Sequence, residues 1–132
     1  MKTIPIAEMI AEGGRDGAVE AADGEFRVRL SSDGEAASVT PEHLFAGAYG
    51  ACFLDELMKA AARAHVALRG VTLMARAHLD GERGPGKLSV ELRAAMPGVS
   101  ESDAQHIMNL AHQTCPYSNA TRGNINVSLA FD

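Results

Sequence analysis

The chain has no tryptophan, and its 132 residues contain only 5% aromatic side chains and two cysteines. Because aromatic residues are scarce, the hydrophobic core must be built mainly from Ala, Val, Leu, Ile and Met. Two cysteines are too few for the disulfide scaffold of a small secreted protein. The first residues, Met1 to Ile6, lack the apolar stretch of a secretion signal, and no apolar run approaches the ~18 residues of a membrane helix. We therefore expect a cytoplasmic protein with no membrane attachment and with reducible thiols.

Positive charge is also in short supply. The chain contains 12 Lys and Arg residues against 17 Asp and Glu residues, which gives a net charge of −5. Proteins that bind nucleic acid need a basic face, so the charge balance excludes a nucleic-acid-binding function. The 46% of hydrophobic and 22% of charged residues are typical of a globular protein. The length predicts a single domain over residues 1–132.

Hydrophobic periodicity predicts both helices and strands. Alternation of apolar and polar residues predicts strands at 26–30, 71–79, 87–95 and 124–131, with a hairpin turn over 80–86. Thr40 and Pro41 predict the start of a helix that extends to about His65, and Ser100 predicts the start of another that Pro116 ends. The order of strand, long helix, hairpin, helix and strand predicts an α+β fold, with antiparallel sheet packed against two helices.

The predicted long helix is apolar nearly all round between Leu44 and Leu57, and it is rich in Ala and Gly. A helix without a polar face must be covered on all sides. So short a chain has little material for that cover, and small residues let another helix approach closely. We therefore expect a second subunit to cover part of this helix.

The two cysteines lie in different settings. Cys52 falls within the apolar helix, whereas Cys115 opens the turn-rich string of residues 115–124. A rigid attacking thiol and a mobile second thiol can form a redox pair. Taken alone, Cys52 is consistent with a small buried hydrophobic residue, and Cys115 with a residue that merely fills a helix end. Composition and spacing leave both interpretations open.

Arg15, which glycines flank on both sides, is the candidate cation that would lower the pKa of a thiol. Glu42 is the candidate carboxylate that would hold Arg15 by a bidentate ion pair. Their simpler roles are a surface arginine and an acidic residue that favours the helix dipole. Glu42 and Cys52 are ten positions apart, about 15 Å along one helix. If both serve one centre, Glu42 must come from the partner chain of a dimer.

Other chemistries find no support in the sequence. The five histidines are scattered, and the single His112-x-x-Cys115 spacing has no second pair, so no zinc site or other metal site is expected. The serines lack the G-x-S-x-G signature of a nucleophilic triad.

Three strings resemble a known family. Residues 40–46 followed by Ala51-Cys52-Phe53 resemble the first cysteine motif of the OsmC-like family. Residues 112–125 resemble the second cysteine motif of its organic hydroperoxide resistance branch, and residues 13–17 resemble the arginine turn of that branch. The resemblance covers nearly the whole chain. It departs at residues 31–39, which are shorter than the Gly/Pro-rich loop of the family, and at His43, where Gln is common.

The resemblance implies a fold and a set of roles. The fold is an intertwined homodimer with antiparallel β-sheets wrapped around two long central helices, and with its sites at the subunit interface. Cys52 resembles the peroxidatic cysteine, Cys115 the resolving cysteine, Arg15 the activating arginine and Glu42 its carboxylate partner. The implied reductant is an external dithiol, a lipoyl-bearing protein rather than thioredoxin, and no cofactor is bound.

The implied function is an antioxidant, stress-response peroxidase that reduces organic hydroperoxides to alcohols. It would act through a Cys52 sulfenic acid and a Cys52–Cys115 disulfide. Phe45 and Phe53 are expected to line the substrate pocket and to favour alkyl or lipid peroxides. Two alternatives stay open: an OsmC-type peroxidase with broader substrates, and a non-catalytic protein that binds a ligand or senses oxidants with the same cysteines.

Overall fold

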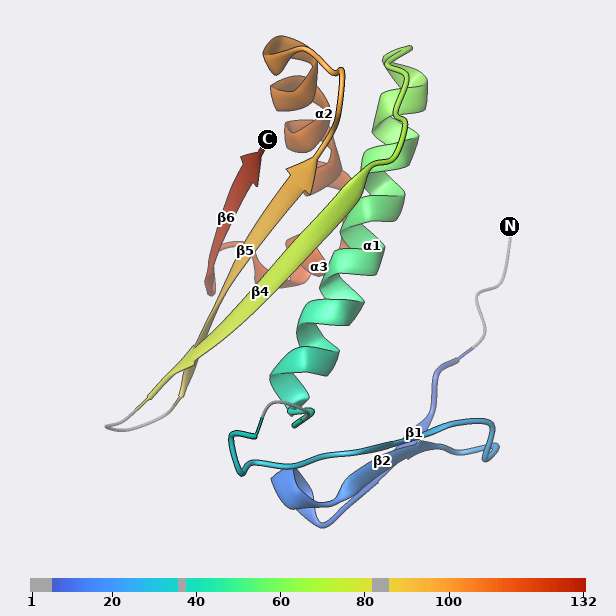
Figure 1. Cartoon of the computed structure of the whole chain (residues 1–132), viewed down its shortest axis with the longest axis vertical. Helices are drawn as coiled ribbons and strands as arrows, with labels where there is room; N and C mark the ends of the chain where they lie inside the picture. Colours follow the sequence, from blue (N-terminus) through green and yellow to red (C-terminus); the bar gives the residue numbers. More distant parts are fainter. Residues whose placement is uncertain (1–5, 36–37, 82–85) are drawn as a thin grey trace. The chain divides into compact units, whose positions relative to one another are not determined.

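Helix α1 is the longest element and runs without a break from Pro41 to Arg63 in the computed structural model, which describes residues 6–35, 38–81 and 86–132 (Figure 1). The hydroxyl Oγ1 of Thr40 accepts a hydrogen bond from the backbone N–H of His43 at 3.3 Å. In return, ring atom Nδ1 of His43 accepts from the backbone N–H of Thr40 at 3.0 Å. This reciprocal pair is a capping box in which His replaces the usual Glu or Gln. The predicted start of the helix is therefore confirmed, and its His43 has a structural role there.

The other end of α1 lies two residues before the predicted end. The helix stops at Arg63, and His65 adopts the left-handed conformation with φ 58°. The backbone N–H of Val66 then reaches back to the carbonyl of Ala61 at 2.8 Å. This bond satisfies one of the carbonyl groups that a helix end leaves without a partner.

The chain forms two compact units, which meet in sequence between Leu44 and Phe45. The first unit contains a three-stranded antiparallel sheet with strands in chain order: β1 (Met9–Glu12), β2 (Ala18–Ala21) and β3 (Arg27–Arg29). The predicted strand at 26–30 corresponds to β3. The sequence pattern did not predict β1 and β2, which the short 3₁₀ helix η1 (Gly14–Asp16) connects. The short segment before α1 includes residues 36 and 37, which lie outside the described residues.

The second unit contains the predicted hairpin. Strand β4 (Thr72–Asp80) pairs with β5 (Lys87–Ala95) in antiparallel register. Residues 82–85 of the predicted turn lie outside the described residues. Strand β6 (Asn126–Phe131) pairs with the other edge of β5, and this pairing is parallel. The expectation of a wholly antiparallel sheet is therefore wrong, because the chain crosses over between β5 and β6 through helices and returns in the same direction.

Two helices make this crossover: α2 (Glu101–Thr114) and α3 (Pro116–Thr121). Ser100 caps α2 as predicted, since its side chain accepts from the backbone N–H of Asp103 at 3.1 Å. The buried stripe of α2 consists of Ala104, Ile107, Met108 and Ala111. Leu110 is only half-buried and Thr114 is exposed, although their spacing from Ile107 would also suit an inward face.

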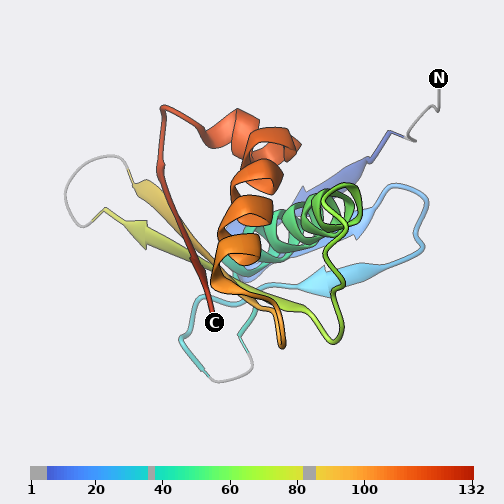
Figure 2. The ribbon, with the colours of Figure 1, turned by 90° about the horizontal axis from the view of Figure 1, so that it is seen from above.

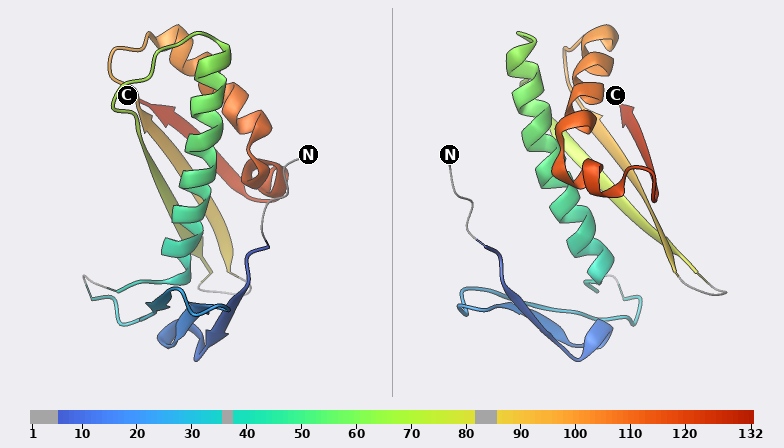
Figure 3. Two further views of the ribbon diagram at one scale, coloured as in Figure 1. Left: turned by 90° about the vertical axis from the view of Figure 1, so that its right-hand side faces the viewer. Right: turned by 180° about the vertical axis from the view of Figure 1, so that it is seen from behind.

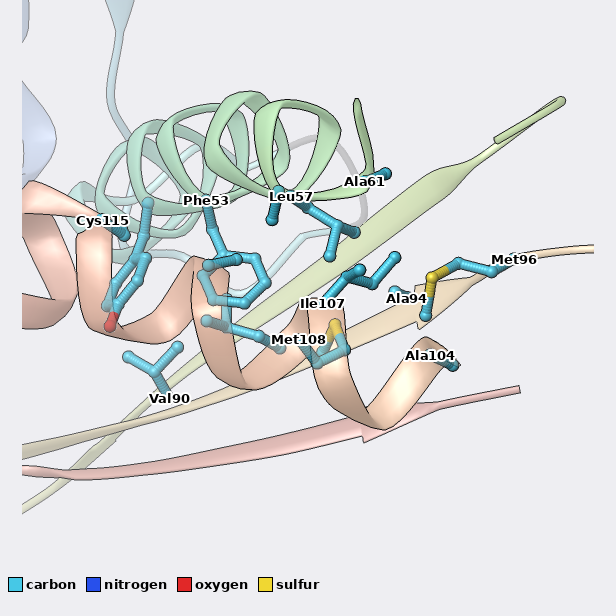
Figure 4. Close-up of a cluster of buried hydrophobic side chains, with 14 residues drawn as sticks. Phe53, Leu57, Ala61, Val90, Ala94, Met96, Ala104, Ile107, Met108 and Cys115 are labelled. Carbon is cyan, nitrogen blue, oxygen red and sulfur yellow. The ribbon is translucent and has the colours of Figure 1, made fainter. Parts of the chain in front are cut away.

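The core of the second unit lies between the helices and one face of its sheet. Figures 2 and 3 show α1 and α2 on the same side of strands β4, β5 and β6. Val90, Leu92 and Ala94 of β5 point into this core, whereas the alternate residues of the strand face away. Figure 4 shows Cys115 at one end of the buried cluster and Met96 at the other. One thiol is therefore part of the core.

Within the described part of the chain, none of the helices has both the length and the apolar character required to cross a membrane.

Candidate functional site

The two cysteines face each other in the second unit. Cys52 lies half-buried on α1, and Cys115 is fully buried. The thiol of Cys115 donates to Sγ of Cys52, with 3.6 Å between the two sulfur atoms. Both thiols are free, and a disulfide bond is about 2.05 Å long, so the atoms need to approach by about 1.5 Å to form one. The structure therefore places the two predicted redox residues within reach of each other.

Cys115 lies at the joint between two helices. It is the C-cap of α2 and the N-cap of α3, with an extended backbone at φ −65° and ψ 123°. Its N–H donates to the carbonyl of Ala111 at 2.8 Å, and its own carbonyl accepts from Asn119 at 3.0 Å. Pro116 occupies the first position of α3, where its missing N–H costs nothing. The predicted helix break at Pro116 is confirmed, although a further short helix follows it.

The surroundings of Cys52 within its own unit favour the protonated thiol. Burial raises the pKa of Cys52, and the hydrogen bond from Cys115 raises it further. The carboxylate of Glu56, one helical turn along α1, also raises the pKa, whereas the backbone N–H of Tyr117 lowers it. Because the thiolate is the nucleophilic form of cysteine, a cation beside Cys52 would increase its reactivity at neutral pH.

Arg15 and Glu42 form the bidentate ion pair that the sequence suggested. The two guanidinium nitrogens donate to the two carboxylate oxygens of Glu42 at 2.8 and 2.7 Å. These hydrogen bonds lower the pKa of Glu42 to about 2, so this carboxylate is ionised at neutral pH. The Arg15 side chain remains 51% exposed. The pair therefore fixes the direction of a guanidinium group that is still accessible.

The turn that carries Arg15 is anchored through the side chain of Asp16. Oδ1 of Asp16 accepts from the backbone N–H of Ser32 at 2.8 Å and from its hydroxyl at 2.7 Å. These bonds lower the pKa of Asp16 and anchor the turn to the segment before α1. Gly13 adopts φ 77°, and a Cβ atom on Gly17 would lie 1.7 Å from the carbonyl oxygen of Glu12. Gly13 and Gly17 of this turn are thus required by its close backbone approach.

The structure brings the four predicted residues together as two pairs. Arg15 and Glu42 lie in the unit that ends at Leu44, and the two cysteines lie in the unit that begins at Phe45. Since α1 is unbroken, Glu42 and Cys52 of one chain are separated by ten residues, about 15 Å along the axis. The action of Arg15 on Cys52 therefore stays a prediction.

The two predicted pocket residues differ in exposure. Phe53 is fully buried in the core, whereas Phe45 is half-buried. The Phe45 ring meets the ring of Tyr49 edge to face, with centroids 6.1 Å apart. Tyr49 in turn meets Tyr117 at 5.8 Å. These aromatic side chains form an apolar row near the half-buried Cys52, and their contact with a substrate stays a prediction.

A buried polar network beside the cysteines was missed by the sequence analysis. The hydroxyl of Tyr49 lies 2.7 Å from Oγ of Ser118, which lies 2.8 Å from Nδ1 of His112. Tyr49 also lies 3.2 Å from Oγ1 of Thr121. Burial lowers the pKa of His112, and the nearby charge of Arg122 lowers it further, so this imidazole is neutral at pH 7. The only advance signal was a cluster of polar residues directly after Cys115.

A second missed contact joins Glu56 to Thr114. The hydroxyl of Thr114 donates to Oε2 of Glu56 at 2.9 Å. Glu56 is four residues beyond Cys52 on α1, and Thr114 directly precedes Cys115. The sequence offered no signal for this pair beyond the i, i+4 spacing of Cys52 and Glu56 on one helix face.

No group of three or more His, Cys, Asp or Glu side chains that could hold a metal ion occurs within residues 6–35, 38–81 and 86–132. The groups that can carry chemistry are two facing thiols in one unit and a guanidinium–carboxylate pair in the other.

Known proteins share both the sequence and the fold. The sequence model of the OsmC-like protein family matches residues 32–130. The organic hydroperoxide resistance protein of Xanthomonas axonopodis pv. citri is 37% identical over 98% of this chain and 96% of its own length. The crystal structure of an organic hydroperoxide resistance protein from Elizabethkingia anophelis superposes with a TM-score of 0.87 at 38% identity, and covers 100% of this chain and 99% of that one.

The organic hydroperoxide resistance protein OhrB of Bacillus subtilis also superposes, with a TM-score of 0.86 at 32% identity over 96% of this chain and 98% of that one. The superposition with the Elizabethkingia protein covers the whole chain and so includes the regions of both cysteine motifs and of the arginine turn. Sequence and fold agree that this chain belongs to the OsmC-like family, in its organic hydroperoxide resistance branch.

Proposed function

We propose that this chain is a cysteine-based peroxidase that reduces organic hydroperoxides to alcohols. The observation that carries the proposal is the pair of free thiols, 3.6 Å apart, in a chain whose relatives are named organic hydroperoxide resistance proteins. A half-buried thiol next to a buried one suits a two-step reaction, because a peroxide can reach the first sulfur and the second is protected from it.

In the first step, the Cys52 thiolate attacks the distal oxygen of the hydroperoxide. The O–O bond breaks, the alkoxide leaves and takes a proton as the alcohol, and Cys52 becomes a sulfenic acid. In the second step, the sulfur of Cys115 attacks the sulfenic sulfur. A water molecule leaves with the hydroxyl and the thiol proton, and the Cys52–Cys115 disulfide forms. The 3.6 Å separation of the two sulfur atoms supports this order of events.

An external dithiol then restores both cysteines by thiol–disulfide exchange, and it is oxidised in turn. A lipoyl group on a partner protein has this chemistry. No cofactor bound to the chain is required for the cycle.

Arg15 supplies a cation to Cys52, whose burial and neighbouring Cys115 raise the pKa of its thiol. A guanidinium next to the sulfur favours the thiolate and stabilises the charge that develops on the leaving oxygen. Glu42 holds Arg15 in place by the bidentate ion pair. Because about 15 Å of helix separates Glu42 from Cys52, the Arg15–Glu42 pair at each Cys52 comes from the other subunit of a homodimer.

The exposed face of α1 supports this dimer. Leu44 is 37% exposed and Met58 is 53% exposed, although both are large apolar residues. Between them, Gly47, Ala48 and Ala51 are also exposed and continue the same stripe at helical spacing. An exposed stripe of small and apolar residues is suited to close packing against a second helix.

We expect the protein to be a homodimer that does not dissociate without unfolding, because the stripe on α1 requires cover. Sedimentation velocity at low micromolar concentration should show a single species of twice the chain mass. Replacing Ala51 on the stripe with Glu should weaken the dimer, whereas replacing the exposed Ala67, outside the helix, with Glu should not. A folded monomer with full activity would remove the dimer and, with it, the shared site.

The function itself is tested by steady turnover. Purified protein should consume cumene hydroperoxide faster than hydrogen peroxide when dihydrolipoamide is present, and thioredoxin should support a lower rate. A redox sensor would show a single oxidation of each subunit instead of turnover. The absence of peroxide consumption with any dithiol would reject the peroxidase.

A further inference from the structure

The two thiols, of Cys52 and Cys115, belong to elements that are far apart in the sequence. Cys52 is fixed on the long helix α1, and Cys115 is fixed at the α2–α3 joint, 63 residues later in the chain. The distance between the two sulfur atoms therefore depends on how firmly the joint is held against α1. Two side chains of α1, Tyr49 and Glu56, make hydrogen bonds to the joint close to the sulfur atoms, and the Tyr49 hydroxyl reaches both Ser118 and Thr121 of α3.

The first contact is the hydrogen bond between Tyr49 and Ser118. Tyr49 precedes Cys52 by three residues on α1, and Ser118 follows Cys115 by three residues on α3. Both residues are 0% exposed, and their oxygen atoms lie 2.7 Å apart. A buried hydrogen bond of this kind holds two elements firmly, because separation would leave polar groups without partners.

The second contact is the hydrogen bond from Thr114 to Glu56. The hydroxyl of Thr114 also lies 3.1 Å from the carbonyl of Leu110 in its own helix. A hydroxyl has only one proton to donate, and the carboxylate at 2.9 Å is the stronger acceptor. The contact therefore connects α2 to α1 rather than α2 to itself.

The two contacts lie on opposite sides of the thiols. Tyr49 and Glu56 are seven residues apart on α1, about 10.5 Å along the axis, and Cys52 lies between them on the same helix face. Ser118 and Thr114 likewise flank Cys115 in the chain. We call Tyr49, Ser118, Glu56 and Thr114 the bracket.

We propose that the bracket is a set of positioning residues that holds Cys115 opposite Cys52 and so sets how readily the two thiols form a disulfide. This inference rests on the proposed role of the two cysteines as a redox pair. With the bracket intact, the reduced protein already holds its sulfur atoms close to bonding distance. When a contact is lost, Cys115 samples more positions, and that freedom must be given up each time the bond forms.

The test measures the dithiol–disulfide equilibrium in a buffer of reduced and oxidised dithiothreitol. Two electrons and two protons pass from Cys52 and Cys115 to the oxidised reagent, and the S–S bond forms in the protein. Tyr49→Phe removes one hydroxyl and leaves Ser118 bonded to His112. Thr114→Val removes the other hydroxyl and keeps the charge of Glu56 and the shape of the side chain.

Each variant should lower the equilibrium constant for disulfide formation by about two- to tenfold, as expected for the loss of one hydroxyl and its hydrogen bonds to the facing element. The double variant should lower it by about tenfold or more, which raises the reduction potential by about 30 mV. Tyr117→Phe is the matched control for Tyr49→Phe. Its hydroxyl has no hydrogen-bond partner among the described residues, and the residue is 39% exposed. Thr72→Val, at an exposed position of β4, is the control for Thr114→Val.

The bracket is overturned if the equilibrium constant of the double variant stays within about twofold of that of the unmodified protein. It is also overturned if the control variants lower this constant as much as the bracket variants do. Because Thr114 is exposed, Thr114→Val tests the proposal even where Tyr49→Phe fails to fold. The measurement uses no peroxide. Unchanged constants in an active peroxidase therefore overturn the bracket alone, and lowered constants in an inactive one support the bracket while the peroxidase is rejected.

Discussion

We expect the Cys52→Ser variant to consume no organic hydroperoxide above the uncatalysed rate. A serine hydroxyl stays protonated at neutral pH and is a poor nucleophile toward the O–O bond, whereas a thiolate is a good one. Cys115→Ser should still react once per subunit and then stop. Its Cys52 sulfenic acid then has no partner thiol 3.6 Å away.

Mass spectrometry under non-reducing conditions separates these outcomes. The oxidised unmodified chain should lose about 2 Da as an intrachain disulfide forms, and the Cys115→Ser chain should gain about 16 and then about 32 Da. A covalent dimer as the main oxidised product would contradict the pairing of Cys52 with Cys115. Steady turnover by Cys52→Ser would contradict its assignment as the attacking residue.

We also expect Arg15→Ala to raise the pKa of Cys52 and to slow its reaction with peroxide at pH 7 by about tenfold or more. The reason is that burial and the neighbouring Cys115 and Glu56 raise the pKa of the thiol, and the guanidinium charge of Arg15 acts against them. An opposite charge within ~4–6 Å lowers a pKa by about one to three units. Iodoacetamide alkylation of Cys52, measured from pH 5 to about 10 in the Cys115→Ser background, reports this pKa directly.

Glu42→Ala should shift the alkylation profile in the same direction but by less, because it releases the guanidinium without removing its charge. The double variant should be less than additive, since both changes act through the position of Arg15. Arg15→Lys keeps the charge but loses the bidentate geometry. Its shift of the alkylation profile should therefore fall between those of Glu42→Ala and Arg15→Ala. Arg27→Ala, an exposed arginine on β3, is the control. If Arg15→Ala leaves the profile unchanged, Arg15 does not act on Cys52.

The sequence predicted those elements that carry a long or regular pattern. Helix α1, the β4–β5 hairpin, α2 and β6 all followed from periodicity and capping residues. Strands β1 and β2 were missed because each has four residues, including Ala and Glu, with little β-branched content. Alternation looks the same in parallel and antiparallel strands. The direction of β6 was therefore not readable from its own residues, although the intervening helix was a signal for a parallel crossover.

The candidate site was predicted to a similar extent. The side-chain chemistry of the two cysteines and of Arg15 and Glu42 predicted them as site residues. The structure places the members of each pair together. The bracket could not be predicted, because its hydrogen bonds join residues that are 69 and 58 positions apart. Tyr, Ser, Thr and Glu are also common residues with many ordinary roles. Only their arrangement around the thiols distinguishes them.

The glycine turn has a consequence for directed evolution of this protein. A library that varies residues 13–17 treats the five positions as equivalent, but the local backbone constrains them differently. At Gly14, with φ 63°, no atom lies within 4 Å of an added Cβ, so Asn and Asp are tolerated there. At Gly17, an added Cβ would lie 1.7 Å from the Glu12 carbonyl oxygen, so every substitution displaces the strand that precedes Arg15. A productive library therefore keeps codons 13 and 17 constant, retains Arg15 and places its diversity at codon 14.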